Sequence, residues 1–265
     1  MKRLRVAAVQ TEPVFGAVER NLETALSLVP ADVDLAVLPE LCNTGYQFRD
    51  RQELADLAEP VPDGPTTARL VRFALETATT VCAGLAEADG DRFFNTAVLV
   101  RPDGTTSRYR KVHLFWDEKD LFTPGDLGFP VVTACGVPVG MMICFDWLFP
   151  EAARSLALGG AALLLHPSNL LLPYCYDAMV TRCLENRVFA VTSNRVGREE
   201  RVPGKGLTFI GLSQVVGPDG RRLAELGRTE TGVAVAELDI AAADKLITPR
   251  NDVLADRRPE MYRLD

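Results

Sequence analysis

The chain has 265 residues, of which 47% are hydrophobic and 25% are charged, the balance of an ordinary globular protein that can bury a core. Its formal net charge of −7 argues against nucleic acids and anionic membranes as partners, because both require a basic face. The one early apolar run, Val6–Val9, is shorter than the roughly 7–15 residues of a signal-peptide core. No stretch reaches the roughly 18 apolar residues of a membrane span. We therefore expect a single cytoplasmic domain over residues 1–265.

The cysteine and histidine residues exclude two further classes of site. The six cysteines include no C-x-x-C pair: Cys42, Cys82, Cys135, Cys144, Cys175 and Cys183. Without an export signal, a disulfide framework is not expected. His113 and His166 are the only histidines, and no spacing resembles a zinc ligand set.

Hydrophobic periodicity predicts alternating strands and helices in the first half of the chain. Strands are expected where short apolar runs occur, at Arg5–Gln10, Asp34–Leu38, Thr80–Glu87 and Phe93–Val100. Helices are expected where apolar residues recur at helical spacing, at Val18–Val29 and Pro65–Thr77. The turn signal Asp89-Gly90-Asp91 joins the last two strands in a hairpin.

The same order of elements returns in the second half. The predicted strands are Val137–Ile143, Ala161–Leu165, Val188–Ser193 and Thr208–Val216, and the predicted helices are Phe149–Leu158 and Tyr174–Arg187. Two short matches support a repeat: AVLPE (Ala36–Glu40) with LLHPS (Leu164–Ser168), and VRPDG (Val100–Gly104) with VGPDG (Val216–Gly220). The chain is therefore expected to contain two halves of the form β-α-β-α-β-β.

These halves predict the fold class. Each half would build a mixed sheet with helices on one face, and the two uncovered faces would bury each other. The result is an α/β fold, a four-layer α-β-β-α sandwich. A single doubly wound sheet is the alternative, and it fits the hairpins less well. Val233–Leu238 predicts a last strand, and the charged tail from Ile240 is expected to pack across the surface or against another subunit.

Cys144 is a candidate nucleophile because of its place in the pattern. It follows a buried strand directly and precedes a helix that begins near Pro150. Open α/β sheets place their chemistry at the carboxyl ends of strands, and a helix start lowers the pKa of a thiol. A buried cysteine that only fills space is the competing interpretation.

Three other polar residues could carry chemistry. Glu40 ends an apolar strand, where burial would raise its pKa towards that of a general base; the alternative is an exposed turn carboxylate. Lys111 lies in Arg108–Phe115, where Lys111 and His113 alternate with apolar residues and would share one face on a strand. Lys111 is then either a solvated edge charge or a group that holds a developing negative charge. His166 could pair with Cys144 as in a Cys-His hydrolase, or be structural.

Five segments together resemble the nitrilase superfamily, the carbon–nitrogen hydrolases: Val37–Tyr46, Tyr109–Phe115, Glu118–Asp126, Gly140–Glu151 and Arg182–Gly197. The resemblance extends over essentially the whole chain, and it implies the same four-layer fold. It implies Glu40 as the base, Lys111 as the lysine of the YRK-x-HLF motif, Glu118 as a second acid and Cys144 as the nucleophile. It also implies an oxyanion donor in the backbone N–H of Phe145, no catalytic histidine, and no cofactor or metal.

The resemblance implies acyl transfer through a thioester. Tyr46, Trp116, Phe145, Trp147 and Asn169 fall in segments that border the family's pocket, and aromatic residues there favour a small, mostly apolar acyl group. Dedicated nitrilases have Trp-Glu where this chain has Phe-Asp at 145–146, which favours a small aliphatic amide as substrate. Aliphatic nitriles and N-carbamoyl amines are the alternatives.

A different class of function is a non-catalytic binding protein on the same scaffold. An inactive relative is expected to have lost Glu40, Lys111 or Cys144, and all three are present, although a fold alone never proves function. Relatives commonly pair through the helices that flank the nucleophile and through the C-terminal tail. A homodimer or a larger homo-oligomer is therefore expected.

Overall fold

A computed structural model describes residues 2–263, and two six-stranded sheets form its centre. The first sheet contains, in spatial order, β14 (Gly232–Asp239), β1 (Arg3–Gln10), β2 (Leu35–Val37), β3 (Thr80–Asp89), β4 (Arg92–Val100) and β5 (Thr106–Arg110). The second contains β13 (Arg222–Glu225), β12 (Gln214–Val216), β9 (Phe189–Ser193), β8 (Leu163–Pro167), β7 (Val137–Met141) and β6 (Val131–Ala134).

The two sheets share one topology. Strands β1, β2 and β3 are parallel, and β4 and β5 continue the sheet antiparallel. Strands β7, β8 and β9 are likewise parallel, with β12 and β13 antiparallel beside them. The crossovers contain α1 (Val18–Ser27) and α3 (Pro65–Thr77) in the first half, and α5 (Pro150–Leu158) and α6 (Cys175–Asn186) in the second. The two predicted β-α-β-α-β-β halves are therefore confirmed.

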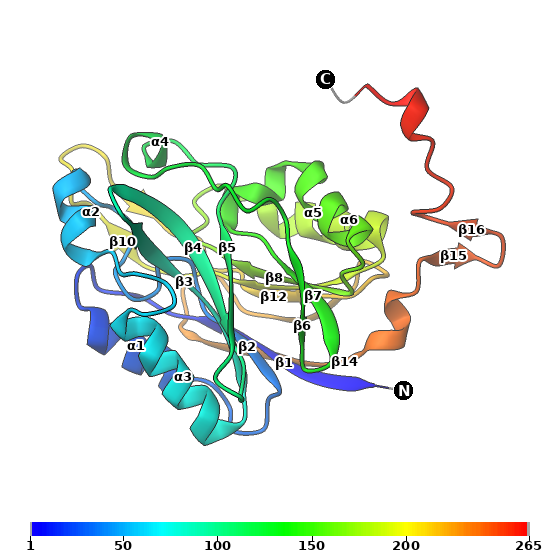
Figure 1. The fold of residues 1–265 in the computed structure, drawn as a ribbon, viewed down its shortest axis with the longest axis horizontal. Helices are drawn as coiled ribbons and strands as arrows, with labels where there is room; N and C mark the ends of the chain where they lie inside the picture. The colour runs from blue at the N-terminus through cyan, green and yellow to red at the C-terminus, as the bar shows by residue number, and fades with distance from the viewer. Residues whose placement is uncertain (1, 264–265) are drawn as a thin grey trace.

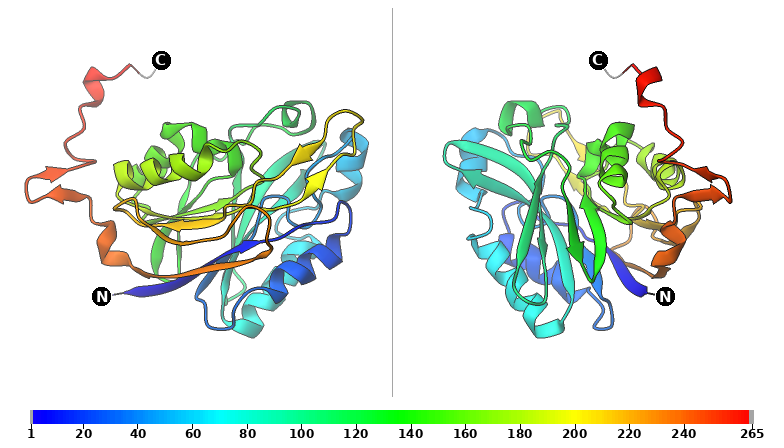
Figure 2. Two further views of the ribbon diagram at one scale, coloured as in Figure 1. Left: turned by 180° about the vertical axis from the view of Figure 1, so that it is seen from behind. Right: turned by 45° about the vertical axis from the view of Figure 1, so that its right-hand side comes forward.

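The layers follow from which sheet faces are apolar. Helices α1 and α3 cover the outside of the first sheet, and α5 and α6 cover the outside of the second (Figures 1 and 2). The inner faces meet directly, with β1 against β9 and with β2 and β3 against β8. The expected α-β-β-α sandwich is thus observed.

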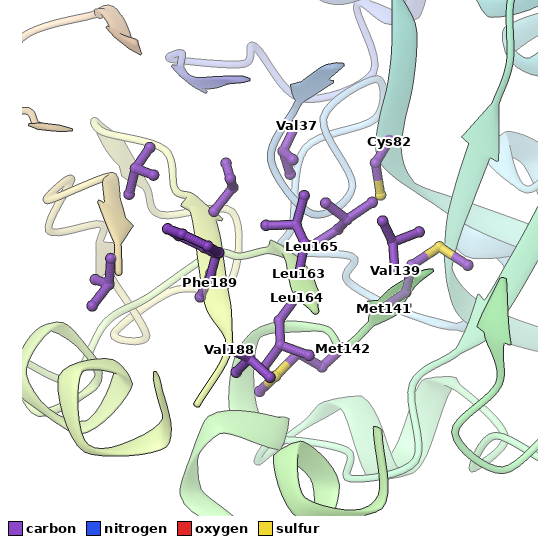
Figure 3. Packing of buried hydrophobic residues seen from close by; sticks show 14 of the residues in the cluster. Val37, Cys82, Val139, Met141, Met142, Leu163, Leu164, Leu165, Val188 and Phe189 are labelled. Carbon is purple, nitrogen blue, oxygen red and sulfur yellow. The ribbon is translucent and has the colours of Figure 1, made fainter. Parts of the chain in front are cut away.

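Strand β8 shows why the sequence of a buried strand is a continuous run of apolar residues. Its residues Leu163, Leu164 and Leu165 are all completely buried. Because side chains alternate along a strand, Leu163 and Leu165 face the first sheet near Val37, whereas Leu164 points towards the helices (Figure 3). Both faces of β8 are covered, as is usual for parallel strands.

Two of the expectations about strands differ from the structure. The expected strand Thr208–Val216 is wrong in its middle, because Gly211 and Leu212 have φ angles of 60° and 61°, which lie outside the extended region of a regular strand. The hypothesis that Lys111 and His113 share one face of a strand is also wrong, because β5 ends at Arg110. Lys111 and His113 therefore lie on an irregular segment.

Several short elements were not predicted. They are α2 (Arg51–Leu57), α4 (Glu118–Leu121), the strands β5, β6 and β13, and the paired strands β10 (Arg198–Glu199) with β11 (Leu207–Thr208) and β15 (Leu246–Thr248) with β16 (Asn251–Asp252). Most have fewer than six residues, too few to show a clear period.

In the tail beyond Ile240, Ala243 and Leu254 pack against the core, and the last part projects from the body of the molecule (Figures 1 and 2). The start of the tail is attached to the body by Lys245. Its ammonium donates to the carbonyls of Asn186 and Arg187 at the end of α6. Beyond it, four apolar side chains are exposed: Leu246, Ile247, Met261 and Tyr262. Of the two expected placements of the tail, packing across the surface does not account for these four exposed side chains, and packing against another subunit stays a prediction. None of the helices in residues 2–263 has both the length and the hydropathy that crossing a membrane requires.

Candidate active site

Three segments that are distant in sequence meet at one end of the sandwich. Glu40 follows β2, Lys111 follows β5 directly, and Cys144 follows β7, so each residue comes just after the carboxyl end of its strand. This is the end at which parallel α/β sheets present functional groups. All three side chains are buried.

Lys111 joins two carboxylates. Its Nζ lies 2.7 Å from Oε1 of Glu40 and 2.8 Å from Oε1 of Glu118. Glu40 Oε1 also accepts from the Asn95 side-chain amide at 2.6 Å, and Glu118 Oε1 accepts from the Tyr46 hydroxyl at 2.7 Å. An ammonium has three N–H groups, so Lys111 keeps one for a further acceptor.

The second oxygen of Glu40 is different. Oε2 is buried, and no hydrogen-bond partner contacts it within the described residues. Burial raises the pKa of Glu40, and the neighbouring Glu118 charge adds to the rise, whereas Lys111 acts in the opposite direction. A carboxylate with a raised pKa and one free oxygen is suited to accept a proton.

The charges in the cluster also govern Lys111. Burial acts to lower the pKa of Lys111, but the Glu118 and Glu40 carboxylates outweigh burial and raise it above the ordinary value. Lys111 is therefore a permanent cation in this site. Its charge compensates the two buried carboxylates, which would be costly without it.

Cys144 starts a five-residue 3₁₀ helix, Cys144–Leu148, and has a φ of 42°. Burial raises the pKa of its thiol, the Glu40 charge raises it further, and Lys111 lowers it. The expectation that a helix start lowers this pKa is wrong, because desolvation and a nearby carboxylate dominate over one short turn. The thiol therefore needs a base to remove its proton.

Asp146 ties the Cys144 turn to the segment that contains Lys111. Its carboxylate accepts from the Tyr109 hydroxyl at 2.7 Å and from the Ile143 N–H at 2.8 Å. It also lies 2.7 Å from Nδ1 of His113, whose ring stacks on Phe149 with a centroid distance of 3.7 Å. His113 is thus held in a structural contact.

His166 also has a structural place. Its Nε2 lies 2.9 Å from the backbone carbonyl of Cys144, and its Nδ1 lies 3.1 Å from the Thr192 hydroxyl. Burial lowers the pKa of His166 to about 4, so the ring is neutral. Because a carbonyl oxygen only accepts, Nε2 bears the proton and supports the Cys144 backbone rather than its thiol.

A small cavity adjoins Cys144. Its walls include Phe115, Phe145, Trp147, Asn169 and the segment 170–172, and its volume is about 10 Å³. Asn169 is buried, yet neither polar atom of its side chain has a partner within the described residues. The backbone N–H of Phe145 donates to no acceptor in residues 2–263.

Tyr46 and Trp116 line a second cavity, of about 40 Å³, together with Glu118. Trp116 is 57% exposed and so lies at the rim. The five residues expected to border a pocket therefore divide into two groups. Phe145, Trp147 and Asn169 line the Cys144 cavity, and Tyr46 and Trp116 line the cavity beside Glu118.

Comparison with known proteins fits this geometry. The carbon-nitrogen hydrolase family model matches residues 5–247. The chain belongs to the carbon-nitrogen hydrolase family. The resemblance to the nitrilase superfamily seen in the sequence is thereby confirmed.

Relatives of this carbon-nitrogen hydrolase cover nearly its full length. A nitrilase from Pyrococcus abyssi is 45% identical over 264 residues, which span 98% of this chain and 99% of the relative. An (R)-stereoselective amidase from Pseudomonas sp. is 38% identical over 96% of this chain and 92% of the relative. The crystal structure of an amidase from Nesterenkonia sp. has a TM-score of 0.82 and 29% identity, covering 97% of this chain and 94% of that one. A mutant of that amidase carries the acetamide moiety of fluoroacetamide, added covalently at the active site cysteine.

Two glycines allow the close approaches that this carbon-nitrogen hydrolase needs at its site. A Cβ on Gly84 of β3 would lie 2.5 Å from the Glu40 Cα, and a Cβ on Gly125 would lie 2.0 Å from the Arg110 carbonyl oxygen. Neither glycine has a left-handed φ, so the requirement is space.

Sequence reasoning missed Asn95, Tyr109 and Asp146 as partners of the site. Asn95 had a detectable signal, because it is a polar residue inside the apolar strand β4. Tyr109 and Asp146 had none, because a buried aromatic residue and a turn carboxylate are both common.

Proposed function

We propose that this chain hydrolyses a small aliphatic amide to a carboxylic acid and ammonia through a thioester on Cys144, as one domain over residues 1–265. The observation that carries the proposal is the buried cluster of Glu40, Lys111 and Glu118 beside a protonated thiol. Within residues 2–263, the cluster contains a carboxylate oxygen without a hydrogen-bond partner and an ammonium with one free N–H, which are the parts that acyl transfer requires.

In the first step Glu40 accepts the proton of the Cys144 thiol while sulfur attacks the amide carbonyl carbon. The carbonyl oxygen becomes an oxyanion, which the third Lys111 N–H and the Phe145 backbone N–H stabilise. One donor of this kind is typically worth about 3–4 kcal/mol in the transition state. Glu40 then passes its proton to the nitrogen, and the C–N bond breaks. Ammonia departs, and a thioester on Cys144 remains.

In the second step water attacks the thioester. Glu40 accepts a proton from the water as its oxygen bonds to the carbonyl carbon, and the same two donors hold the new oxyanion. The C–S bond breaks, the carboxylic acid leaves, and Glu40 returns the proton to sulfur. The raised pKa of Glu40 supports a group that both takes and gives a proton.

Glu118 has a supporting role in this scheme. It accepts from Lys111 and from the Tyr46 hydroxyl through the same oxygen. Lys111 is thus held between two carboxylates, and its free N–H has a defined direction. Fixed donors are effective because no reorganisation is needed when charge develops.

The Cys144 cavity supports a short acyl chain. Phe115, Phe145 and Trp147 form much of its wall, so a small apolar group bound to Cys144 would lie among aromatic side chains. The Asn169 side chain, which has no hydrogen-bond partner among the described residues, supports a polar contact to the substrate there.

A nitrile substrate is the second candidate, since the Pyrococcus abyssi relative at 45% identity is named a nitrilase. Asp146 was part of the sequence argument for amides, but its carboxylate is engaged with Tyr109, His113 and Ile143. The preference for amides over nitriles therefore depends on Phe145, which lines the Cys144 cavity.

The deciding experiment measures ammonia release from short aliphatic amides, the matching nitriles and N-carbamoyl amines. Intact-protein mass spectrometry, run in parallel, detects an acyl adduct. We expect amide turnover with a thioester on Cys144. The Cys144→Ala variant should lose turnover and adduct, whereas Cys42→Ala, at another buried thiol, should keep both.

Two outcomes would contradict the proposal. Turnover of nitriles alone would make the second candidate correct. Retained turnover in Cys144→Ala would remove Cys144 as the nucleophile.

We also propose that the protein is a cytoplasmic homodimer or larger homo-oligomer. The four exposed apolar side chains of the projecting tail support this. Light scattering on the full chain and on a chain ending at Lys245 tests it, and equal masses would argue against a role for the tail.

A further inference from the structure

One of the buried ion pairs outside the Glu40–Lys111–Glu118 cluster joins Arg195 to Glu199. The Arg195 guanidinium donates to Oε1 of Glu199, and both side chains are at most 5% exposed. Arg195 also stacks over the Phe209 ring at 4.0 Å and donates to the Pro13 carbonyl at 3.1 Å. Ion pairs buried to this degree are favourable only when their remaining hydrogen-bonding atoms are satisfied.

The Glu199 carboxylate is satisfied by backbone from the other half of the chain. Its Oε2 accepts the Gln47 N–H at 2.7 Å, and the Tyr46 N–H lies 3.2 Å from each oxygen. Tyr46 and Gln47 end the turn that starts after Glu40. The turn contains left-handed residues at Leu41 and Gly45, with φ angles of 46° and 85°. Glu199 therefore holds the end of a turn that has the proposed base at its start.

The Tyr46 side chain connects the Glu199 contact to the Glu40–Lys111–Glu118 cluster. Its hydroxyl donates to Glu118 Oε1 at 2.7 Å, and the same oxygen accepts from Lys111 at 2.8 Å. Burial raises the pKa of Tyr46 well above its usual value, and the Glu118 charge adds to the rise. The hydroxyl therefore stays a donor, and its position depends on where the Tyr46 backbone is held.

We propose that Glu199 is a positioning residue of this active site. By holding the N–H groups of Tyr46 and Gln47, it places the Tyr46 hydroxyl on Glu118 and so orients Lys111. Arg195 balances the Glu199 charge. This inference rests on the proposed function, because Lys111 matters as the oxyanion donor of that mechanism.

The test compares Glu199→Gln, Tyr46→Phe and the double variant. One readout is kcat and KM with the best substrate of the amide panel. The other is the pH dependence of Cys144 alkylation by iodoacetamide, which requires no substrate. The matched control is Glu53→Gln. Glu53 lies in α2 and pairs with Arg201 at 2.6 Å, but it makes no hydrogen bond to Tyr46 or Gln47 in the described part of the chain.

We expect Glu199→Gln to lower kcat about tenfold with little change in KM, because small displacements of positioned groups are costly. It should shift the pH profile of alkylation in the same direction as Tyr46→Phe. The double variant should be no worse than Tyr46→Phe alone, since both changes act on one contact. Glu53→Gln should leave both readouts at the wild-type values.

Glu199→Gln leaves the Arg195 charge buried without its counter-charge, so it is also expected to lower stability. Glu199→Asp keeps the charge but shortens the side chain by one methylene, and it should cause the same loss of kcat in a folded protein. The proposal is overturned if either folded variant keeps wild-type kcat and alkylation, or if the effects of Glu199→Gln and Tyr46→Phe add. If wild type turns over no substrate in the panel, alkylation still decides the role of Glu199, and only the proposed function fails.

Discussion

The Tyr109 hydroxyl donates to the Asp146 carboxylate over 2.7 Å, and both residues are completely buried. Tyr109 lies in β5 of the first sheet, two residues before Lys111, and Asp146 lies two residues after Cys144 in the second half. The Val112 N–H also donates to the Tyr109 oxygen at 3.1 Å. One buried hydrogen bond thus holds the Lys111 segment against the turn of the proposed nucleophile.

Tyr109→Phe tests the value of this contact. The change leaves one buried carboxylate oxygen with a missing donor, so the free energy of unfolding should fall by about 1–3 kcal/mol. kcat should fall as well, because the two segments lose a shared support. Urea unfolding and amide turnover measure the two effects. Tyr176→Phe is the control, since its hydroxyl bonds Glu225 at the surface; equal losses in both variants would show that the buried bond has no special role.

Lys111→Met should change how stability depends on pH. The pKa of Glu40 is raised above 4.5, so between 4.5 and its folded value the folded state binds more protons than the unfolded state. Stability therefore falls as pH rises through that window. Removing Lys111 removes an interaction that lowers this pKa, so the decline should extend to higher pH. Urea unfolding at a series of pH values measures it, and the exposed Lys119→Met should follow wild type. If the plots of stability against pH are parallel for Lys111→Met and wild type, the Lys111–Glu40 ion pair does not set the pKa of Glu40.

The lowered pKa of His166 predicts that, at acid pH, the free energy of unfolding changes with pH in the opposite direction. Its pKa falls from 6.5 to about 4 on folding, so between these values the unfolded state binds more protons. Stability should therefore rise with pH across this range, by about 3 kcal/mol in total. His166→Gln should lose that part of the slope. An NMR titration of the His166 ring provides a direct check, and a midpoint near 6.5 would refute the assignment.

Gly84→Ala tests the close approach of β3 to Glu40. A Cβ there lies 2.5 Å from the Glu40 Cα, so backbone must move, at a cost of about 1–3 kcal/mol. Turnover should fall with stability because Glu40 is displaced. Gly232→Ala in β14 is the matched control, since its Cβ meets nothing nearer than Leu226 at 3.6 Å. Similar behaviour of the two variants would mean that space at Gly84 is unimportant.

Much of the fold was predictable because its signals are local. Helix α3 was predicted with its observed bounds, since Pro65 starts it and an apolar stripe repeats along it. The repeat of AVLPE and LLHPS placed β2 and β8 at equivalent positions. The middle of Thr208–Val216 was mispredicted because the left-handed backbone at Gly211 and Leu212 interrupts an otherwise suitable strand composition.

The sequence by itself determined the two β-α-β-α-β-β halves and the family, and it named Glu40, Lys111, Glu118 and Cys144 together. Only the tertiary structure decided how burial and neighbouring charges shift the pKa values of Glu40, Lys111 and Cys144. The pKa of Cys144 is raised rather than lowered, because desolvation and the Glu40 charge depend on packing between two sheets. The Tyr109–Asp146 hydrogen bond and the Arg195–Glu199 ion pair next to Tyr46 also depend on the packing of distant segments, so only the tertiary structure showed them. Periodicity reports which face of an element is buried, but not which distant polar group it meets there.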